Sequence, residues 1–473
     1  MKHKPKAAIP APRKRRLFRL APPRTLDRRG GLRAATLSAA EGVDPGRLPE
    51  LCGLRLPRVH TLAVRGTATG MALLDGRLYI TSIDGDEGVL HCFRDGNLVS
   101  TVSFTPDGGA DEGREILQFN LYSDPSDPLG GEYQHMGLLF PEGLFFPLGT
   151  DTPELSALSE KFGMPIPRLS RATVFLSRVF GVCGDRLYAS AYNDPQNWNI
   201  DTAADTGAAN AWSATVQSNT EASGDFRAIT CFGGEVLAFK DGFCHVLSGT
   251  KNPFRVSDLF AVGAACPRSI AEVGGRLFFA DRGQVYRYNG DAVTPIGDAL
   301  GVSDFTGAIG CAGEGLYYLF LPALGELFAY AVENGAWSSL GRVSGDCPVR
   351  FISRGEGGPL LLDAEGKLYS LASGDERQFF CTLSPVTEDG DATMRLCRLV
   401  LSLSGEAGDE IRAAFCDLSG RERVLLDTTL SHDGFFRLVG RSFTPADRGG
   451  YLSLSGRGAL SVQQIELMTE TQE

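Results

Sequence analysis

Residues 273–279, Val273-Gly274-Gly275-Arg276-Leu277-Phe278-Phe279, join the apolar end of one strand to a glycine turn and then to an aromatic strand. Six further stretches repeat this order of apolar residues, a Gly-rich or acidic turn, and a branched or aromatic strand. They are residues 74–79, 140–146, 182–188, 231–237, 311–318 and 357–362. Aligned at positions 77, 143, 186, 235, 276, 315 and 359, the repeats are 66, 43, 49, 41, 39 and 44 residues apart. Five of these six steps match the roughly 40–50 residues of a four-stranded propeller blade.

This spacing predicts an all-β fold built on a β-propeller of about seven blades, with six to eight possible. Short strands ending in Asp-Gly and Asn-Gly turns, such as Asp95-Gly96 and Asn289-Gly290, are strong hairpin signals. A composition of 43% hydrophobic residues with 58 glycines suits many short strands joined by tight turns.

The repeats divide the chain into four predicted parts. Residues 1–34 are expected to form a basic flexible arm, residues 35–69 an extended lead-in, and residues 70–377 the propeller. From residue 378 the pattern changes to alternating polar and apolar residues, as in 394–403 and 410–416. Such alternation is typical of antiparallel strands with one solvated face, and it predicts a small C-terminal antiparallel β-sandwich over residues 378–473.

Charge is distributed unevenly along the chain. The formal net charge is −11, yet residues 1–34 carry twelve Lys or Arg against the single acid Asp27, so the remainder is strongly acidic. A basic, Pro-containing arm buries too little apolar surface to fold alone. We therefore expect it to stay mobile until it meets an acidic partner or nucleic acid, or else to serve only as a solubilising tail.

Catalytic and metal-binding motifs are absent from the sequence. It contains no Gly-x-Ser-x-Gly, no His-Glu-x-x-His, no P-loop and no Cys-x-x-Cys. Its six histidines are dispersed, its acidic clusters suit turns as well as calcium loops, and its eleven cysteines stand singly. These observations predict a protein that is not an enzyme, has no cofactor or metal, and is made in a reducing compartment. No apolar run is long enough for a membrane helix.

Residues 177–199 form the most specific stretch of the chain. A strand, a Gly-Asp turn and a second strand lead into an Asn-Asp-Pro corner, Asn193-Asp194-Pro195, and then to Trp198. Pro195 forces its predecessor out of helical geometry, and the Asp194 side chain can bond the turn backbone. An alternative interpretation of the corner is the closing turn of a blade, with Trp198 as its apolar plug.

The same stretch resembles propeller-type virion structural proteins of tailed phages and prophages, in which a Tyr-Ala-Ser strand leads to an Asp-Pro-x-x-Trp corner. Shorter matches at 236–249, 268–279, 286–290 and 327–337 occur in the same order. Architecture of this kind is similar to that of packaged-DNA stabilisation proteins. The resemblance implies a non-enzymatic virion protein at the head-tail connector or tail hub, working as a homo-oligomer.

On this interpretation the protein is made in the cytoplasm of the bacterial host and resides in the virion. Its expected partners are further copies of itself, portal or connector and tail proteins, and packaged DNA, which the basic arm could reach. We expect no membrane partner. The candidate partner-binding residues are Arg15, Arg16 and Arg19 of the arm and Asn193, Asp194, Asn197 and Trp198 of the corner.

Two alternatives remain open from the sequence. The first is a receptor- or glycan-binding propeller module that uses long loops near residues 105–130 and 199–224. The second is a polysaccharide lyase or glycosidase, because 57 acidic residues always offer pairs of carboxylates.

Overall fold

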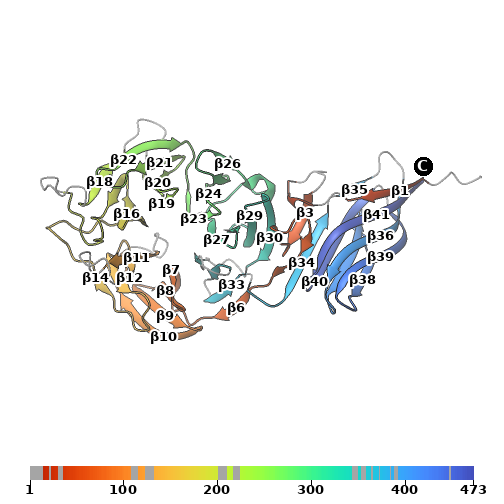
Figure 1. Ribbon diagram of the computed structural model, residues 1–473, viewed down its shortest axis with the longest axis horizontal. Coiled ribbons are helices and arrows are strands. Elements are labelled where there is room, and N and C mark those ends of the chain that lie inside the picture. Colours follow the sequence, from red (N-terminus) through yellow and green to blue (C-terminus); the bar gives the residue numbers. More distant parts are fainter. Residues whose placement is uncertain are drawn as a thin grey trace, which may run out of the picture.

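The computed structural model describes residues 14–20, 23–29, 36–107, 115–122, 133–200, 210–216, 224–343, 350–352, 358–363, 366–371, 373–383, 385–387, 393–446 and 449–472. A ring of small sheets occupies one end of the molecule and two longer-stranded sheets the other (Figure 1). In this part of the chain, helix is limited to the 3-10 turn η1 (Gly297–Leu300). None of the described residues form a helix that is long and apolar enough to cross a membrane.

The described residues form seven antiparallel blades of four strands each. Blade 1 is β7 (Thr67–Leu74), β8 (Arg77–Asp84), β9 (Glu87–Arg94) and β10 (Asn97–Phe104). Blade 2 is β11 (Ile116–Tyr122), β12 (Tyr133–Leu139), β13 (Leu144–Pro147) and β14 (Ser156–Ala157). Blade 3 is β15 (Arg171–Phe175), β16 (Arg178–Cys183), β17 (Arg186–Ala189) and β18 (Trp212–Thr215). Blade 4 is β19 (Ala228–Phe232), β20 (Glu235–Lys240), β21 (Phe243–Ser248) and β22 (Arg255–Phe260).

Blade 5 is β23 (Cys266–Val273), β24 (Arg276–Ala280), β25 (Val285–Tyr288) and β26 (Val293–Pro295). Blade 6 is β27 (Ile309–Gly313), β28 (Leu316–Leu321), β29 (Glu326–Ala331) and β30 (Ala336–Arg342). Blade 7 is β31 (Arg350–Ile352), β32 (Leu360–Leu362), β33 (Lys367–Ser370) and β6 (Arg58–Thr61). The first strand of each blade contacts the first strands of both neighbouring blades, and β31 contacts β7, so the ring is closed.

This arrangement confirms the prediction of an all-β protein built on a propeller. Burial follows position within a blade, since the middle strands β8 and β9 are almost wholly buried while the outer strand β10 is mostly exposed. Apolar side chains from facing blades fill each interface. Between blades 3 and 4, for instance, the rings of Phe180 and Phe254 meet edge to face with centroids 5.1 Å apart.

The recurring stretch marks different turns in different blades. In blades 1, 4, 5, 6 and 7 it joins the first strand to the second, but in blades 2 and 3 it joins the second to the third. The first turn of blade 3 is Leu176-Ser177, with φ of 47° and 53°. This turn lacks the Asn or Gly that normally signals a hairpin, so the recurring sequence pattern does not include it. The long 66-residue step is partly a consequence of this change of position.

Blade 7 corrects the predicted lead-in. The strand β6 (Arg58–Thr61) lies within residues 35–69, yet it pairs with β33 and completes the last blade. The propeller is therefore closed by one strand from before blade 1 and three strands from its far end. Most of the two predicted long loops, at 108–114, 123–132, 201–209 and 217–223, lie outside the described residues.

The sandwich is formed from both ends of the chain. Sheet I contains β1 (Lys14–Arg19), β41 (Ser461–Gln472), β36 (Thr393–Gly405), β39 (Gly434–Ala446) and β4 (Leu51–Cys52). Sheet II contains β34 (Arg377–Leu383), β40 (Gly449–Arg457), β37 (Glu410–Asp417) and β38 (Glu422–Thr429), with β5 (Leu54–Arg55) and β35 (Val386–Thr387) at its margin. Buried side chains such as Leu401 and Leu467 from sheet I share one core with Leu454 and Phe415 from sheet II.

The described part of the arm contains paired strands, which differs from the flexible arm predicted for residues 1–34. Residues 14–19 form β1, an edge strand that pairs with β41 along its whole length (Figure 1). Residues 25 and 26 form β2 (Thr25–Leu26), parallel to β3 (Thr36–Glu41). The alternation of side chains along β1 allows Arg15 and Arg19 to face acidic residues of β41. A count of charged residues along the sequence does not reveal this pairing. Residues 1–13 lie outside the described residues.

The strand β3 joins propeller to sandwich. It pairs in parallel with β30 of blade 6 at Glu41 and Ser339, and antiparallel with β34 of sheet II. One continuous sheet therefore runs from blade 6 into the sandwich, and Figure 1 shows β3 between β30 and β34. Trp337 of β30 is buried in the shared core, where its Nε1 donates to the Ile296 carbonyl at 2.8 Å.

Substitution Leu37→Ala in β3 tests this junction. Leu37 is fully buried in the shared core, so we expect a loss of about 2–5 kcal/mol in the free energy of unfolding. Leu98→Ala on the exposed strand β10 is the matched control and should cost less than about 0.5 kcal/mol. Urea unfolding followed by circular dichroism measures both, and equal losses would show that β3 does not hold the two halves together.

Two histidines are buried among apolar and aromatic groups. His91 lies 2.9 Å from the Ser82 hydroxyl, and the Nδ1 of His245 lies 3.0 Å from Oδ1 of Asp258. Burial lowers the pKa of both side chains, in the case of His245 against the opposing effect of Asp258. Each histidine is therefore held neutral in the folded protein.

Acid should weaken the fold through these groups. The contribution of each neutral histidine to stability is fully present above the unfolded-state pKa of about 6.5. It is lost as the pH falls toward the lower folded-state pKa, by at most about 1.4 kcal/mol per pH unit for each proton. We expect His245→Gln to flatten the dependence of the unfolding free energy between neutral and mildly acidic pH. The control Leu98→Ala, which alters no titratable group, should leave that slope unaltered. An unchanged slope in the His245 variant would contradict the assignment.

Candidate functional site

The Asn-Asp-Pro corner follows β17 and connects three segments of blades 2 and 3. Asn193 has a φ of 51°, and its backbone N–H donates to the Ser177 carbonyl at 2.7 Å. Asp194 accepts from the Gln196 backbone N–H at 3.1 Å and pairs with Lys161 Nζ at 2.7 Å. The corner therefore lies against the β15–β16 turn and against the segment that follows β14.

Trp198 and Asn197 serve the interior of this corner. Trp198 is only 4% exposed, packs between blades 2 and 3, and donates from Nε1 to the Pro195 carbonyl at 3.0 Å. The Oδ1 of Asn197 accepts from the Asn199 backbone N–H at 3.0 Å. Trp198 is thus the apolar plug that the sequence suggested, and it is not accessible to a partner in this conformation.

Arg178 organises the opposite side of the same corner. It is 2% exposed, and its Nη1 donates to the carbonyls of Ser190 at 2.6 Å and Asn210 at 2.8 Å. Its guanidinium lies over the Phe254 ring, 5.6 Å from the centroid. Burial lowers the pKa of Arg178 from its very high usual value. In the sequence Arg178 is only one member of the stretch 177–199, and its burial beneath the corner depends on segments distant along the chain.

Three large apolar side chains are exposed around the corner. They are Phe162, Tyr192 and Leu176, at 75%, 59% and 39% exposure, and we call them the corner patch. Phe162 follows Lys161, whose Nζ binds Asp194; Tyr192 precedes Asn193, which is bonded to the residue after Leu176. These contacts bring the three segments together on the surface.

Two members of the corner patch occupy unusual backbone positions. Phe162-Gly163 and Leu176-Ser177 are turns in which both residues have positive φ, a conformation that favours Asn and Gly. For a bulky side chain this region costs roughly 1–2 kcal/mol. The molecule therefore accepts both strain and apolar exposure at the same corner, which is a combination more typical of contact surfaces than of a solvated turn.

The arm residues face the protein itself. Arg15 Nε lies 2.7 Å from Glu470 Oε1, and Arg19 Nε lies 3.4 Å from Glu466 Oε1, although both arginines are 73% exposed. Arg16 stands opposite Thr469 in the ladder and is also exposed. The acidic neighbour expected for the arm is, for these described residues, strand β41 of the same chain. A second partner for them stays a prediction.

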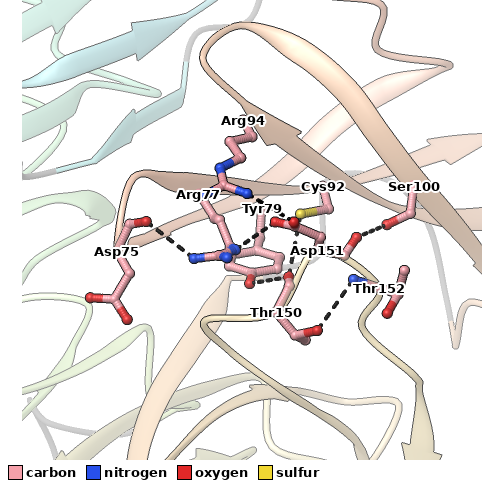
Figure 2. Close-up of polar contacts among 9 residues, drawn as sticks. All are labelled: Asp75, Arg77, Tyr79, Cys92, Arg94, Ser100, Thr150, Asp151 and Thr152. Carbon is pink, nitrogen blue, oxygen red and sulfur yellow. Dashed lines mark hydrogen bonds and ion pairs between the residues drawn. The ribbon is translucent and has the colours of Figure 1, made fainter.

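A polar cluster between blades 1 and 2 has the residue types of a catalytic site. Figure 2 shows Asp151 held by Arg77 at 2.7 Å and Arg94 at 3.0 Å, while Tyr79 donates to the Thr150 carbonyl at 2.7 Å. Hydrogen bonding to Arg77 lowers the pKa of Asp151, and burial raises the pKa of Tyr79. These contacts hold the segment that follows β13 of blade 2 against strands β8 and β9 of blade 1.

Two kinds of hollow occur in the described residues. A cavity of about 410 Å³ lies among the first strands of blades 1, 2, 5 and 6, where Arg268 stands with Glu115 and Glu272. Two hollows of about 420 and 450 Å³ on sheet II share Phe380, Arg412 and Ser455. The described residues contain no group of three or more His, Cys, Asp or Glu placed to hold a metal ion.

Comparison with known proteins finds no matching family model and no curated relative. Among solved structures, the chain is similar to virginiamycin B lyase from Staphylococcus aureus at 11% identity and a TM-score of 0.45, covering 67% of this chain and 98% of that one. It is also similar to KlHsv2 at 10% identity and a TM-score of 0.35, covering 68% and 94%. The exo-beta-1,3-galactanase of Phanerochaete chrysosporium matches at 11% identity and a TM-score of 0.27, covering 88% and 99%.

These comparisons carry no functional inference for this chain, because identity and structural similarity are both low. The class of protein is defined by the strand pairing itself: a seven-bladed propeller joined through a shared sheet to a β-sandwich.

Arg178→Met tests the internal support of the corner. The substitution removes the donor for one buried and one partly buried carbonyl, so we expect a loss of roughly 1–3 kcal/mol in unfolding free energy. Arg186→Met on the exposed side of the same blade should change stability by less than about 0.5 kcal/mol. Thermal unfolding measures the two variants side by side. Equal stability of both would mean that Arg178 does not support the corner.

Proposed function

We propose that the protein is a non-enzymatic structural component of a tailed-phage virion, at the head-tail connector or tail hub, and that it works as a homo-oligomer in contact with portal or tail proteins. The ordered resemblance of residues 177–199 to such proteins supports this role. None of the three solved structures named above is a virion protein. The proposal therefore depends on this chain's own residues.

The corner patch is the observation that carries the proposal. Exposed aromatic residues contribute most of the binding energy in many protein interfaces, because they bury large areas at little entropic cost. Here two aromatic side chains and a leucine surround the same motif that suggested the family. The motif residues hold the corner from inside, and the patch supplies the contact surface outside.

The shared sheet between the two halves suits an assembly protein. This sheet and a common core connect the sandwich to blade 6. Closure of the propeller also leaves few unpaired edges, so copies can meet through loops and faces without extending a sheet from one molecule to the next.

Glycan binding is the second candidate function. The adjoining hollows on sheet II contain Phe380, 43% exposed, and Tyr451, together with the Arg412–Glu422 ion pair at 2.9 Å. An aromatic surface beside paired polar groups suits a sugar ring, which presents apolar C–H faces and hydroxyl groups. A monomeric protein that binds a glycan array, and is absent from phage particles, would favour this function.

The double substitution Phe162→Ser and Tyr192→Ser tests the assembly role. We expect the purified protein to form oligomers and the variant to associate at least about tenfold more weakly, because interface aromatics commonly contribute about 2 kcal/mol or more each. Light scattering after gel filtration measures the association. Leu418→Ser, at a residue 50% exposed in the sandwich, is the matched control and should leave it unchanged.

Mass spectrometry of purified particles from the host strain completes this test. The protein should be found in intact particles, and the double variant should be depleted from them while the control is incorporated normally. A chain that is monomeric at all concentrations and missing from the particles would overturn the proposal.

A further inference from the structure

The outer face of sheet I carries a regular set of arginines. Leu399, Leu401 and Leu467 point into the sandwich core, so the alternate positions of the same strands point outward. Residues paired across a ladder lie on the same face, which extends this assignment from β36 to β39, β41 and β1. We call the outward set the arginine face, which consists of Arg15, Arg19, Arg395, Arg398, Arg437 and Arg441.

Four of these six arginines lie near a carboxylate. Glu466 is 3.4 Å from Arg19 and 3.7 Å from Arg437. Glu470 binds Arg15 and stands directly opposite Arg395 in the ladder. The two glutamates therefore neutralise part of the face, and both belong to β41.

The row that crosses Arg398 differs from its neighbours. Its members across the sheet are Leu17, Met468, Arg398 and Arg441, so two arginines stand directly opposite each other and the row holds no acid. Like charges in this position destabilise a sheet. The Nε of Arg398 is also buried and has no hydrogen-bond partner within the described residues. A buried guanidinium N–H without an acceptor is unfavourable as well.

An oxyanion placed between the two guanidinium groups would relieve the repulsion between them. Guanidinium groups bind phosphate oxygens through paired hydrogen bonds, and the charge of one phosphate would offset the repulsion between two neighbouring cations. Leu17, 58% exposed, and Met468 form the apolar floor of the same row and offer no competing acceptor of comparable strength.

We propose that Arg398 and Arg441 form an oxyanion site and that the arginine face binds the phosphodiester backbone of a nucleic acid. One phosphate suffices for the Arg398–Arg441 pair, whereas the arginines in the adjoining rows extend the positive charge on either side of it. A polymer with regularly repeated charges fits such a face better than a single ion does. The choice of nucleic acid rests on the proposed function, because the packaged genome is the abundant polyanion of a phage particle.

Fluorescence anisotropy of a short labelled DNA duplex with the full chain tests the site. We expect salt-dependent binding that Arg398→Gln/Arg441→Gln weakens by at least about tenfold, with the slope of log affinity against log salt reduced in magnitude by about two. Arg398→Lys/Arg441→Lys should keep most of that slope. Arg227→Gln, which breaks an exposed ion pair with Asp241 in blade 4, is the matched control and should bind like the unaltered protein.

Folding is checked by thermal unfolding of each variant. If the double variant is unstable, the single variant Arg441→Gln on the exposed edge strand β39 provides the comparison. Inorganic phosphate is added as a competitor, and weak displacement of the duplex would support recognition of the polymer. Equal binding by the Gln and control variants, or equal displacement by polyglutamate and by unlabelled DNA, would overturn the proposal.

The outcome can be separated from that of the proposed function. A protein that is present in particles yet does not bind DNA would remove this site and leave the virion role intact. A protein that binds DNA through Arg398 and Arg441 and is absent from particles would support this site and contradict the virion role.

Discussion

The strand β3 pairs with β30 on one side and with β34 on the other, and the rest of the molecule is arranged around this double pairing. It bonds to the propeller at Glu41 and to the sandwich at four positions from Leu37 to Glu41. Apolar residues of β3, among them Leu37 and Ala40, complete a core that includes Trp337 on one side and Leu454 on the other. The same six residues supply buried apolar side chains and backbone hydrogen bonds. Separating the halves would therefore expose those side chains to water and break those bonds.

Much of the propeller could be predicted from the sequence, because each blade repeats local signals. Turns such as Gly274-Gly275 carry their conformational requirement in the residues themselves, and their spacing reflects the length of a blade. The strand β6 could not be placed in the same way, because its partner β33 is some three hundred residues distant and pairing over such a range leaves no local mark. For the same reason β1 read as a charged tail rather than as the edge strand of a sheet.

The corner shows a similar division between local and distant information. Asn193, Asp194 and Trp198 were recognisable from their order, and each has a definite structural role there. Phe162 and Leu176 were missed because neither is a residue type that positive φ normally selects. Gly163 was the one turn signal in these two stretches, and the Leu176-Ser177 turn carries none. Arg398 and Arg441 became neighbours only through the register of β36 and β39, which the sequence does not specify.

Pairing of β1 with β41 also determines when the molecule can be completed during its synthesis. Strands β1, β3, β4 and β5 leave the ribosome more than three hundred residues ahead of their partners β34 and β41. The nascent chain therefore carries unpaired strand edges until those partners have emerged. During that interval the edges are exposed to other nascent chains on the same messenger RNA.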